Sequence, residues 1–145
     1  MILDDNLAAA PRELHDADRQ LRFINFLVDQ VLIYLLGSLL TAPLLFLFIT
    51  VAPGSIIVYY LPFLLVYVAY YYLFERYAGG RTPGKRLTRT RVVRTDGSPP
   101  TAGHLLGRSL ARLVPFEIFS IYFSDHRRAW HDDWSGTRTV IDESR

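Results

Sequence analysis

The feature that most constrains this 145-residue chain is an apolar run from Phe23 to Val51 that contains a single carboxylate, Asp29. An α-helix needs about 20 apolar residues to cross a bilayer, so this run is long enough to span one. A charged side chain near the centre of such a helix costs at least about 2.5–3.5 kcal/mol. Asp29 must therefore pair with a buried partner or bind an ion, and we predict a polar site around it.

A second apolar run, Ile56–Phe74, follows the uncharged turn at 52–55. At 1.5 Å per residue it would be about 28 Å long, close to the roughly 30 Å of bilayer hydrocarbon. Tyrosines gather near both of its ends, as is typical of the aromatic belts at membrane interfaces. We therefore predict helices over 22–48 and 56–75 that form a transmembrane hairpin.

The basic residues predict how this hairpin is oriented. The turn at 52–55 has none, whereas seven lie between Arg76 and Arg94. Basic residues favour the cytoplasmic side of a membrane, so we expect the N-terminus and the C-terminus to be cytosolic. Because this segment directly follows a membrane helix, anionic lipid headgroups are its expected partners, and nucleic acid is not.

The remaining segments predict a small cytosolic unit. We expect a mobile cytosolic arm over 1–20 and a single domain over 21–145. After the two long helices, this domain should contain a loop and strand at 79–103, a helix at 104–124 and a strand at 137–141. The apolar part of the third helix, Leu113–Phe123, is short for a span. It favours an amphipathic or re-entrant helix, with a full span as the alternative. The fold class is thus an all-α membrane protein with a small two-stranded β element, in which 90–95 pairs with 137–141.

Several catalytic and metal-binding classes are disfavoured. Gly79–Lys85 resembles a phosphate-binding loop, but Arg86 replaces the required Ser or Thr, and a strand is expected where a helix should follow. The His and Asp residues within 125–133 fit no recurrent metal-ligand spacing. The chain has no cysteine and no visible nucleophile–base arrangement. We therefore expect no enzymatic activity, no metal and no cofactor.

A polar stripe on the first helix is the best candidate site. Arg22, Asn25 and Asp29 are spaced by three and four residues, which places them on one helix face. Arg22 and Asp29 are separated by a rise of about 10 Å, so each needs a partner from elsewhere. The candidates are Glu75 or Asp132 for Arg22, and Arg108, Arg112 or Tyr67 for Asp29. These eight residues form the predicted ion, ligand or buried-charge site.

Three motifs in order resemble the RDD family of bacterial membrane proteins. They are Arg22 and Asp29 in the first helix, the GRTPGKRL, RVV and DG stretches after the second, and the closing WHDDWSGTRTV. The family is named for one arginine and two aspartates, and Asp132 is the second aspartate here. The resemblance covers about residues 19–141.

This resemblance implies a multi-pass protein of the bacterial inner membrane. Transport of an unidentified ligand has been suggested for the family, with cation/proton exchange proposed for some members. Two or three helices are too few to enclose a pathway, so transport would require a homo-oligomer or a partner membrane protein. The alternative is a non-transporting scaffold or accessory subunit whose buried charges fix helix packing.

Overall fold

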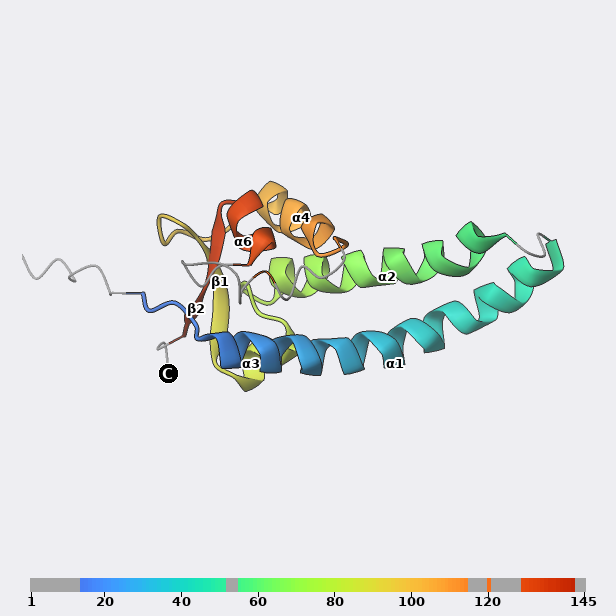
Figure 1. The fold of residues 1–145 in the computed structure, drawn as a ribbon, viewed down its shortest axis with the longest axis horizontal. Coiled ribbons are helices and arrows are strands. Elements are labelled where there is room, and N and C mark those ends of the chain that lie inside the picture. The colour runs from blue at the N-terminus through green and yellow to red at the C-terminus, as the bar shows by residue number, and fades with distance from the viewer. Residues whose placement is uncertain (1–13, 52–54, 115–119, 121–128, 143–145) are drawn as a thin grey trace, which may run out of the picture.

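In a computed structural model of the chain, residues 14–51, 55–114, 120 and 129–142 can be described. Two long helices, α1 (Arg19–Val51) and α2 (Ile56–Tyr77), lie side by side and extend away from a small head (Figure 1). Both begin and end within three residues of their predicted bounds. The architecture is thus an elongated helical hairpin with one end packed into the head.

The head consists of short elements from the second half of the chain. They are α3 (Pro83–Leu87), β1 (Thr90–Arg94), α4 (Ala102–Ala111), α6 (Trp130–Trp134) and β2 (Thr137–Ile141). The strands β1 and β2 pair in antiparallel register, with Thr90 opposite Ile141 and Arg94 opposite Thr137. The predicted strand pairing is therefore confirmed.

The segment before α1 lies against this sheet. Asp16 forms an isolated bridge with Val140, and the Ala17 backbone N–H donates to the Thr139 carbonyl oxygen at 2.9 Å. The last residues of the predicted N-terminal arm are thus held at the edge of β2, next to the point where α1 begins.

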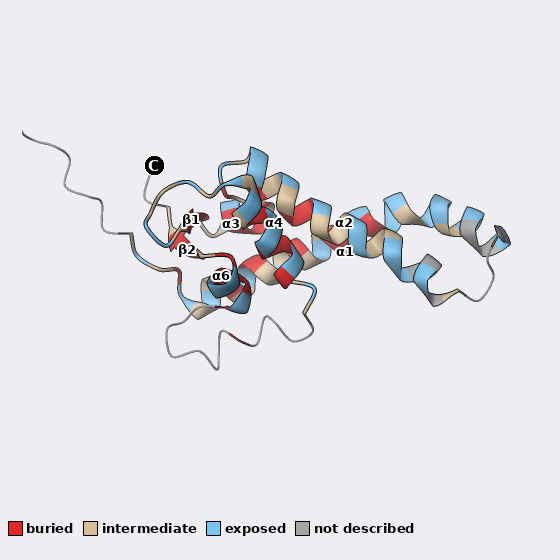
Figure 2. Cartoon of the chain, turned by 90° about the horizontal axis from the view of Figure 1, so that it is seen from above, coloured by how far each residue is buried: buried red, intermediate tan, exposed pale blue. Residues whose placement is uncertain are grey.

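The part of the hairpin far from the head exposes apolar side chains (Figure 2). Leu39 and Phe46 of α1 are 71% and 77% exposed, and Leu65 of α2 is 62% exposed. Soluble proteins rarely leave a continuous apolar surface of this kind in water. Within the described residues, one helix is long and apolar enough to cross a membrane, at Arg19–Leu47 of α1. A mostly helical fold with a candidate span and a small sheet is therefore confirmed.

Asp29 does not lie in the middle of the apolar stretch. It contacts the head, and the 22 residues from Gln30 to Val51 continue beyond it without a charge. At 1.5 Å per residue this stretch is about 33 Å long, which covers the bilayer hydrocarbon without Asp29. The stretch beyond Asp29 is therefore long enough to span a bilayer by itself, although the candidate span Arg19–Leu47 also includes Asp29. The position of Asp29 at membrane depth stays a prediction.

Only the first part of the predicted third helix, 104–124, falls mostly within the described residues. α4 ends at Ala111 and packs against α2, while most of the apolar stretch Leu113–Phe123 lies outside the described residues. Arg108 and Arg112 were predicted as candidate partners of Asp29. Both side chains instead form ion pairs with Glu75 inside the head.

The loop predicted after Gly79 contains the short helix α3. Thr82 is its N-cap residue and Pro83 its first residue, an arrangement that favours helix initiation. The expectation that a strand directly follows this loop was therefore wrong, because β1 begins only at Thr90. Arg86 still stands where a phosphate-binding loop requires Ser or Thr, so the segment is still not expected to bind a nucleotide.

Candidate functional site: a buried charge network between hairpin and head

The Asp29 carboxylate is bound by three neutral donors from two other parts of the chain. Its Oδ1 accepts hydrogen bonds from the Tyr70 hydroxyl and the Gly84 backbone N–H, both at 2.9 Å. Its Oδ2 accepts the Thr82 hydroxyl at 2.5 Å. Backbone N–H groups in the first turn of a helix lack intrahelical partners and favour a negative charge. Asp29 of α1 therefore serves as an acceptor for the first turn of α3.

Gly84 permits this close approach. A Cβ atom at Gly84 would lie 2.5 Å from the Asn25 backbone oxygen and 3.0 Å from Asp29 Oδ1. The first of these neighbours is backbone and cannot rotate away. The local sequence Thr82-Pro83-Gly84 thus supplies a cap, a helix start and the space for α1 to contact α3.

Asp132, in α6, joins two arginines from different helices. One carboxylate oxygen accepts from Arg22 of α1 and the other from Arg108 of α4. Arg22 also donates to the Thr139 carbonyl oxygen at 3.2 Å, and Arg108 donates to the Thr139 hydroxyl at 3.0 Å. Asp132 and Arg108 are fully buried, so the cluster links α1, α4, α6 and β2 without contact to solvent.

Glu75, near the end of α2, forms a second cluster. Its carboxylate lies 2.6 Å from Lys85 Nζ, 3.4 Å from Arg108 Nε and 3.8 Å from Arg112 Nη2. Because Arg108 pairs with both Glu75 and Asp132, the two clusters form one network. This network joins α2 to the head just as Arg22 joins α1 to it.

The cations determine the protonation state of the head. Burial alone would raise the pKa of Asp132, but the guanidinium groups of Arg108 and Arg22 outweigh it and hold that pKa well below its ordinary value. Burial lowers the pKa of Lys85, although the Glu75 carboxylate acts in the opposite direction. Asp132 is therefore an anion at neutral pH, and the arginines around it have a permanent counter-charge.

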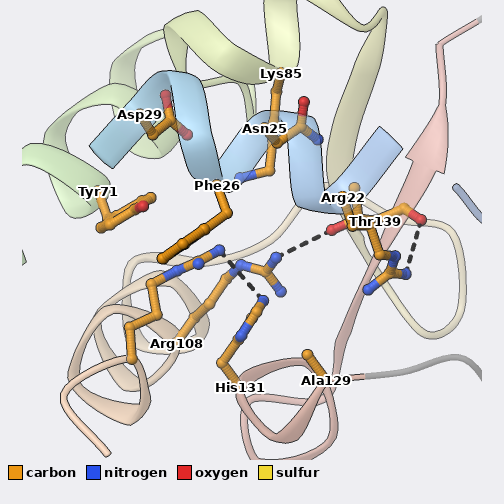
Figure 3. Close-up of a pocket in the computed structure, with 11 residues that line it drawn as sticks. Arg22, Asn25, Phe26, Asp29, Tyr71, Lys85, Arg108, Ala129, His131 and Thr139 are labelled. Carbon is orange, nitrogen blue, oxygen red and sulfur yellow. Dashed lines mark hydrogen bonds between the residues drawn. The ribbon is translucent and has the colours of Figure 1, made fainter. Parts of the chain in front are cut away.

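A small cavity of about 30 Å³ lies within this network. Such a volume holds about one water molecule. Figure 3 shows that the surrounding side chains come from α1, α2, α3, α4 and the C-terminal part of the head. The lining residues are Arg22, Asn25, Phe26, Asp29, Tyr71, Lys85, Arg108, Arg112, Ala129, His131 and Thr139.

The structure brings most of the predicted site residues to the junction of hairpin and head, with some different partners. Arg22 pairs with Asp132, one of its two predicted partners. Asp29 contacts Tyr70 rather than Tyr67, one turn of α2 away, and no ion pair joins it to Arg108 or Arg112 in the part of the chain that is described. Tyr67 instead packs its ring against that of Tyr71, with centroids 5.2 Å apart.

Asn25 and Asp132 also have defined places. The Asn25 side-chain N–H donates to the Thr90 hydroxyl at 3.0 Å, so this residue joins α1 to β1. Asp132 is buried and its neighbour Asp133 is exposed, which identifies Asp132 as the aspartate of the network.

The sequence analysis missed Thr82, Gly84 and Lys85 as site residues. A Thr-Pro-Gly helix start was the available signal for the first two. Lys85 was assigned to the basic segment facing lipid because it lies among the seven basic residues between Arg76 and Arg94. In the structure Arg86 and Arg89 are exposed, whereas Lys85 is buried against Glu75.

Comparison with known protein families matches residues 17–136 to the RDD family. The matched segment contains Arg22, Asp29 and Asp132, together with the other charged residues of the network. No curated protein and no solved structure matches the chain.

Proposed function

Since the chain belongs to the RDD family, whose members are membrane proteins of unclear function, we propose that it is a membrane scaffold or accessory subunit. In this proposal the buried charges fix the cytosolic head to the end of a helical hairpin. The observation that supports it most is the bonding of Asp29, whose two carboxylate oxygens together accept three hydrogen bonds from α2 and from the start of α3. A carboxylate used in this way is a packing element. For the same reason the proposal includes no enzymatic role.

The other two carboxylates support the same conclusion. Asp132 and Glu75 each contact at least two cations that come from other elements. Removing one partner from a buried ion pair usually destabilises a protein by about 3–5 kcal/mol. The three acids therefore act as attachment points between α1, α2 and the head.

Ion transport, including cation/proton exchange, is the second candidate. The observation in its favour is the cavity, which has the Asp29 carboxylate in its lining. The two long helices enclose no pathway by themselves, so transport would take place in a homo-oligomer or with a partner membrane protein. The exposed apolar faces of α1 and α2 are the surfaces available for such contacts.

Replacing Asp29 with asparagine distinguishes the two candidates. The amide keeps one oxygen for Tyr70 and Gly84 but loses the charge and presents an N–H₂ group to Thr82. We expect the free energy of unfolding to fall by about 1–3 kcal/mol, the usual cost of weakening a hydrogen bond to a buried charge. Thermal unfolding of purified protein in detergent measures this loss, and Asp133→Asn is the matched control at an exposed carboxylate.

Flux measurements complete the test. In liposomes with a pH gradient, the scaffold proposal expects no cation-dependent proton flux for wild type or for Asp29→Asn. A wild-type flux that disappears in Asp29→Asn, while the melting temperature stays unchanged, would contradict the scaffold proposal and support transport.

We further propose that α2 is a second span and that the protein is a multi-pass protein of the bacterial inner membrane, with its head in the cytosol. α2 has 22 residues and pairs with α1, and the turn between the two helices contains no basic residue. The exposed residues Arg86 and Arg89 then lie beside the membrane, where they would face anionic lipid headgroups. They line, with Arg81, Lys85 and Asp142, a cleft of about 410 Å³.

Single cysteines test this topology in a chain that has none of its own. We expect an impermeant thiol reagent added outside intact cells to label Ser55→Cys, in the turn between the helices. Ser98→Cys, in the head, should react only after the membrane is permeabilised. Labelling of Ser98→Cys in intact cells would contradict a cytosolic head.

A further inference from the structure

We propose that the cavity between hairpin and head binds a small monovalent anion of the size of chloride. This inference concerns a ligand, and it does not depend on whether the protein is a scaffold or a transporter. It rests on the charge of the cavity lining, on a buried hydroxyl in that lining and on the cavity volume.

The charge of the lining is strongly asymmetric. Four basic side chains, Arg22, Lys85, Arg108 and Arg112, line the cavity together with one carboxylate, Asp29. Glu75 and Asp132 pair with these cations but are not part of the lining. Counted together with Glu75 and Asp132, the four basic side chains exceed the three carboxylates by one charge. Because electrostatic interactions are stronger in a buried site than in water, this excess positive charge favours an anion over a cation.

The Tyr71 hydroxyl supplies an unused donor. Tyr71 is 1% exposed and lines the cavity, and its hydroxyl has no hydrogen-bond partner among the described residues. A buried hydroxyl without a partner is costly, typically by about 1–3 kcal/mol. The guanidinium group of Arg112 lies 4.2 Å from the centre of the Tyr71 ring, and both residues line the cavity. An anion in the cavity would accept this hydrogen bond.

The size of the cavity and Asp29 together restrict the charge and class of the anion. A volume of about 30 Å³ suits a single small ion and is too small for a phosphate ester or a nucleotide. The carboxylate in the lining disfavours a dianion, because it would repel a second negative charge. Halides and ions of similar size remain, and chloride is the probe of choice.

Chloride titration at constant ionic strength tests the site. Wild-type protein in detergent is titrated with sodium chloride against sodium gluconate, whose anion is too large for the cavity. Keeping the ionic strength constant removes general screening of the surface charges. We expect the melting temperature to rise with chloride and to saturate, as it does when a ligand binds the folded state. In a crystal soaked in bromide, anomalous scattering should show bromide in the cavity.

Two variants should shift the apparent affinity in opposite directions. Tyr71→Phe removes the donor and should weaken chloride binding about tenfold, whereas Tyr77→Phe, which removes an 80% exposed hydroxyl from the same helix, should not. Asp29→Asn removes the negative charge from the lining and should strengthen binding. Because the two substitutions should change the chloride affinity in opposite directions, a general loss of stability cannot explain both results.

Three results would overturn the proposal. The first is equal melting temperatures in chloride and gluconate over the whole titration. The second is a cavity that contains only water in bromide-soaked crystals. The third is a chloride effect that Tyr71→Phe and Asp29→Asn both leave unchanged, because the anion would then bind elsewhere.

Discussion

Replacing Asp132 with alanine should detach the head from the hairpin and lower the free energy of unfolding by about 3–5 kcal/mol. The substitution leaves Arg22 buried without a carboxylate and leaves Arg108 with only its longer contact to Glu75, at 3.4 Å. A buried charge without a partner is far more costly than an exposed one. Thermal unfolding would measure the loss, and limited proteolysis would show whether the head becomes accessible.

Asp133→Ala is the matched control, since it removes the same side chain from the next position of α6. Asp133 is exposed, so its substitution should change stability by no more than about 0.5 kcal/mol. A double variant, Arg22→Met with Asp132→Leu, should recover part of the loss because it removes both charges together. Equal stabilities for Asp132→Ala and Asp133→Ala would show that the network does not hold the head.

The pH dependence of stability follows from the same contacts. An Asp132 pKa held well below the ordinary value of about 3.9 means that the ion pairs stabilise the fold at every pH above that ordinary value. Their contribution is lost only as the pH falls further, through the folded-state pKa. The contribution of Asp132 to the free energy of unfolding should therefore be constant between about pH 5 and 7. In acid this contribution should decline in wild type, whereas Asp132→Ala has no such contribution to lose.

The sequence predicted the elements whose signals are local. The apolar runs predicted α1 and α2 to within three residues, and the alternation in 90–95 and 137–141 predicted two strands that pair. The polar stripe Arg22, Asn25 and Asp29 also followed from spacing alone. Each of these patterns lies within one segment, so no knowledge of tertiary structure was needed.

The partners of the stripe could not be predicted with the same certainty, because they depend on where the head docks. For Asp29 the predicted partners were Arg108, Arg112 or Tyr67. In the structure three neutral groups donate to its carboxylate, and one of them is the Gly84 backbone N–H, which has no side-chain signature. Lys85 was assigned to lipid because its neighbours are basic, and only the tertiary contact with Glu75 shows otherwise.

Gly84→Ala should have an effect comparable to the loss of Asp132, although it adds only one methyl group. The new Cβ would lie 2.5 Å from the Asn25 backbone oxygen, so α3 must move away from α1. Overpacking of this kind typically costs about 1–3 kcal/mol, and the displacement also weakens the bonds from Thr82 and Gly84 to Asp29. We expect a loss of about 3 kcal/mol or more in thermal unfolding.

Gly107→Ala is the matched control, because Gly107 lies inside helix α4 and a Cβ atom there meets nothing within 4 Å. In a helix, alanine is favoured over glycine by about 1 kcal/mol, so this variant should be as stable as wild type or more so. If Gly84→Ala behaves like Gly107→Ala, the contact between α1 and α3 is not tight and the role assigned to Gly84 is wrong.

A double-mutant cycle then connects Gly84 to the Asp29 site. If α3 moves away in Gly84→Ala, the donors of Thr82 and Gly84 no longer reach the carboxylate. Asp29→Asn would then weaken fewer hydrogen bonds than it does in wild type. The destabilisation by Asp29→Asn should therefore be smaller in the Gly84→Ala background than in wild type, with a coupling of about 0.5–3 kcal/mol. Additive effects would mean that the two substitutions act independently, so that the contact of α3 with α1 does not hold the Asp29 carboxylate in place.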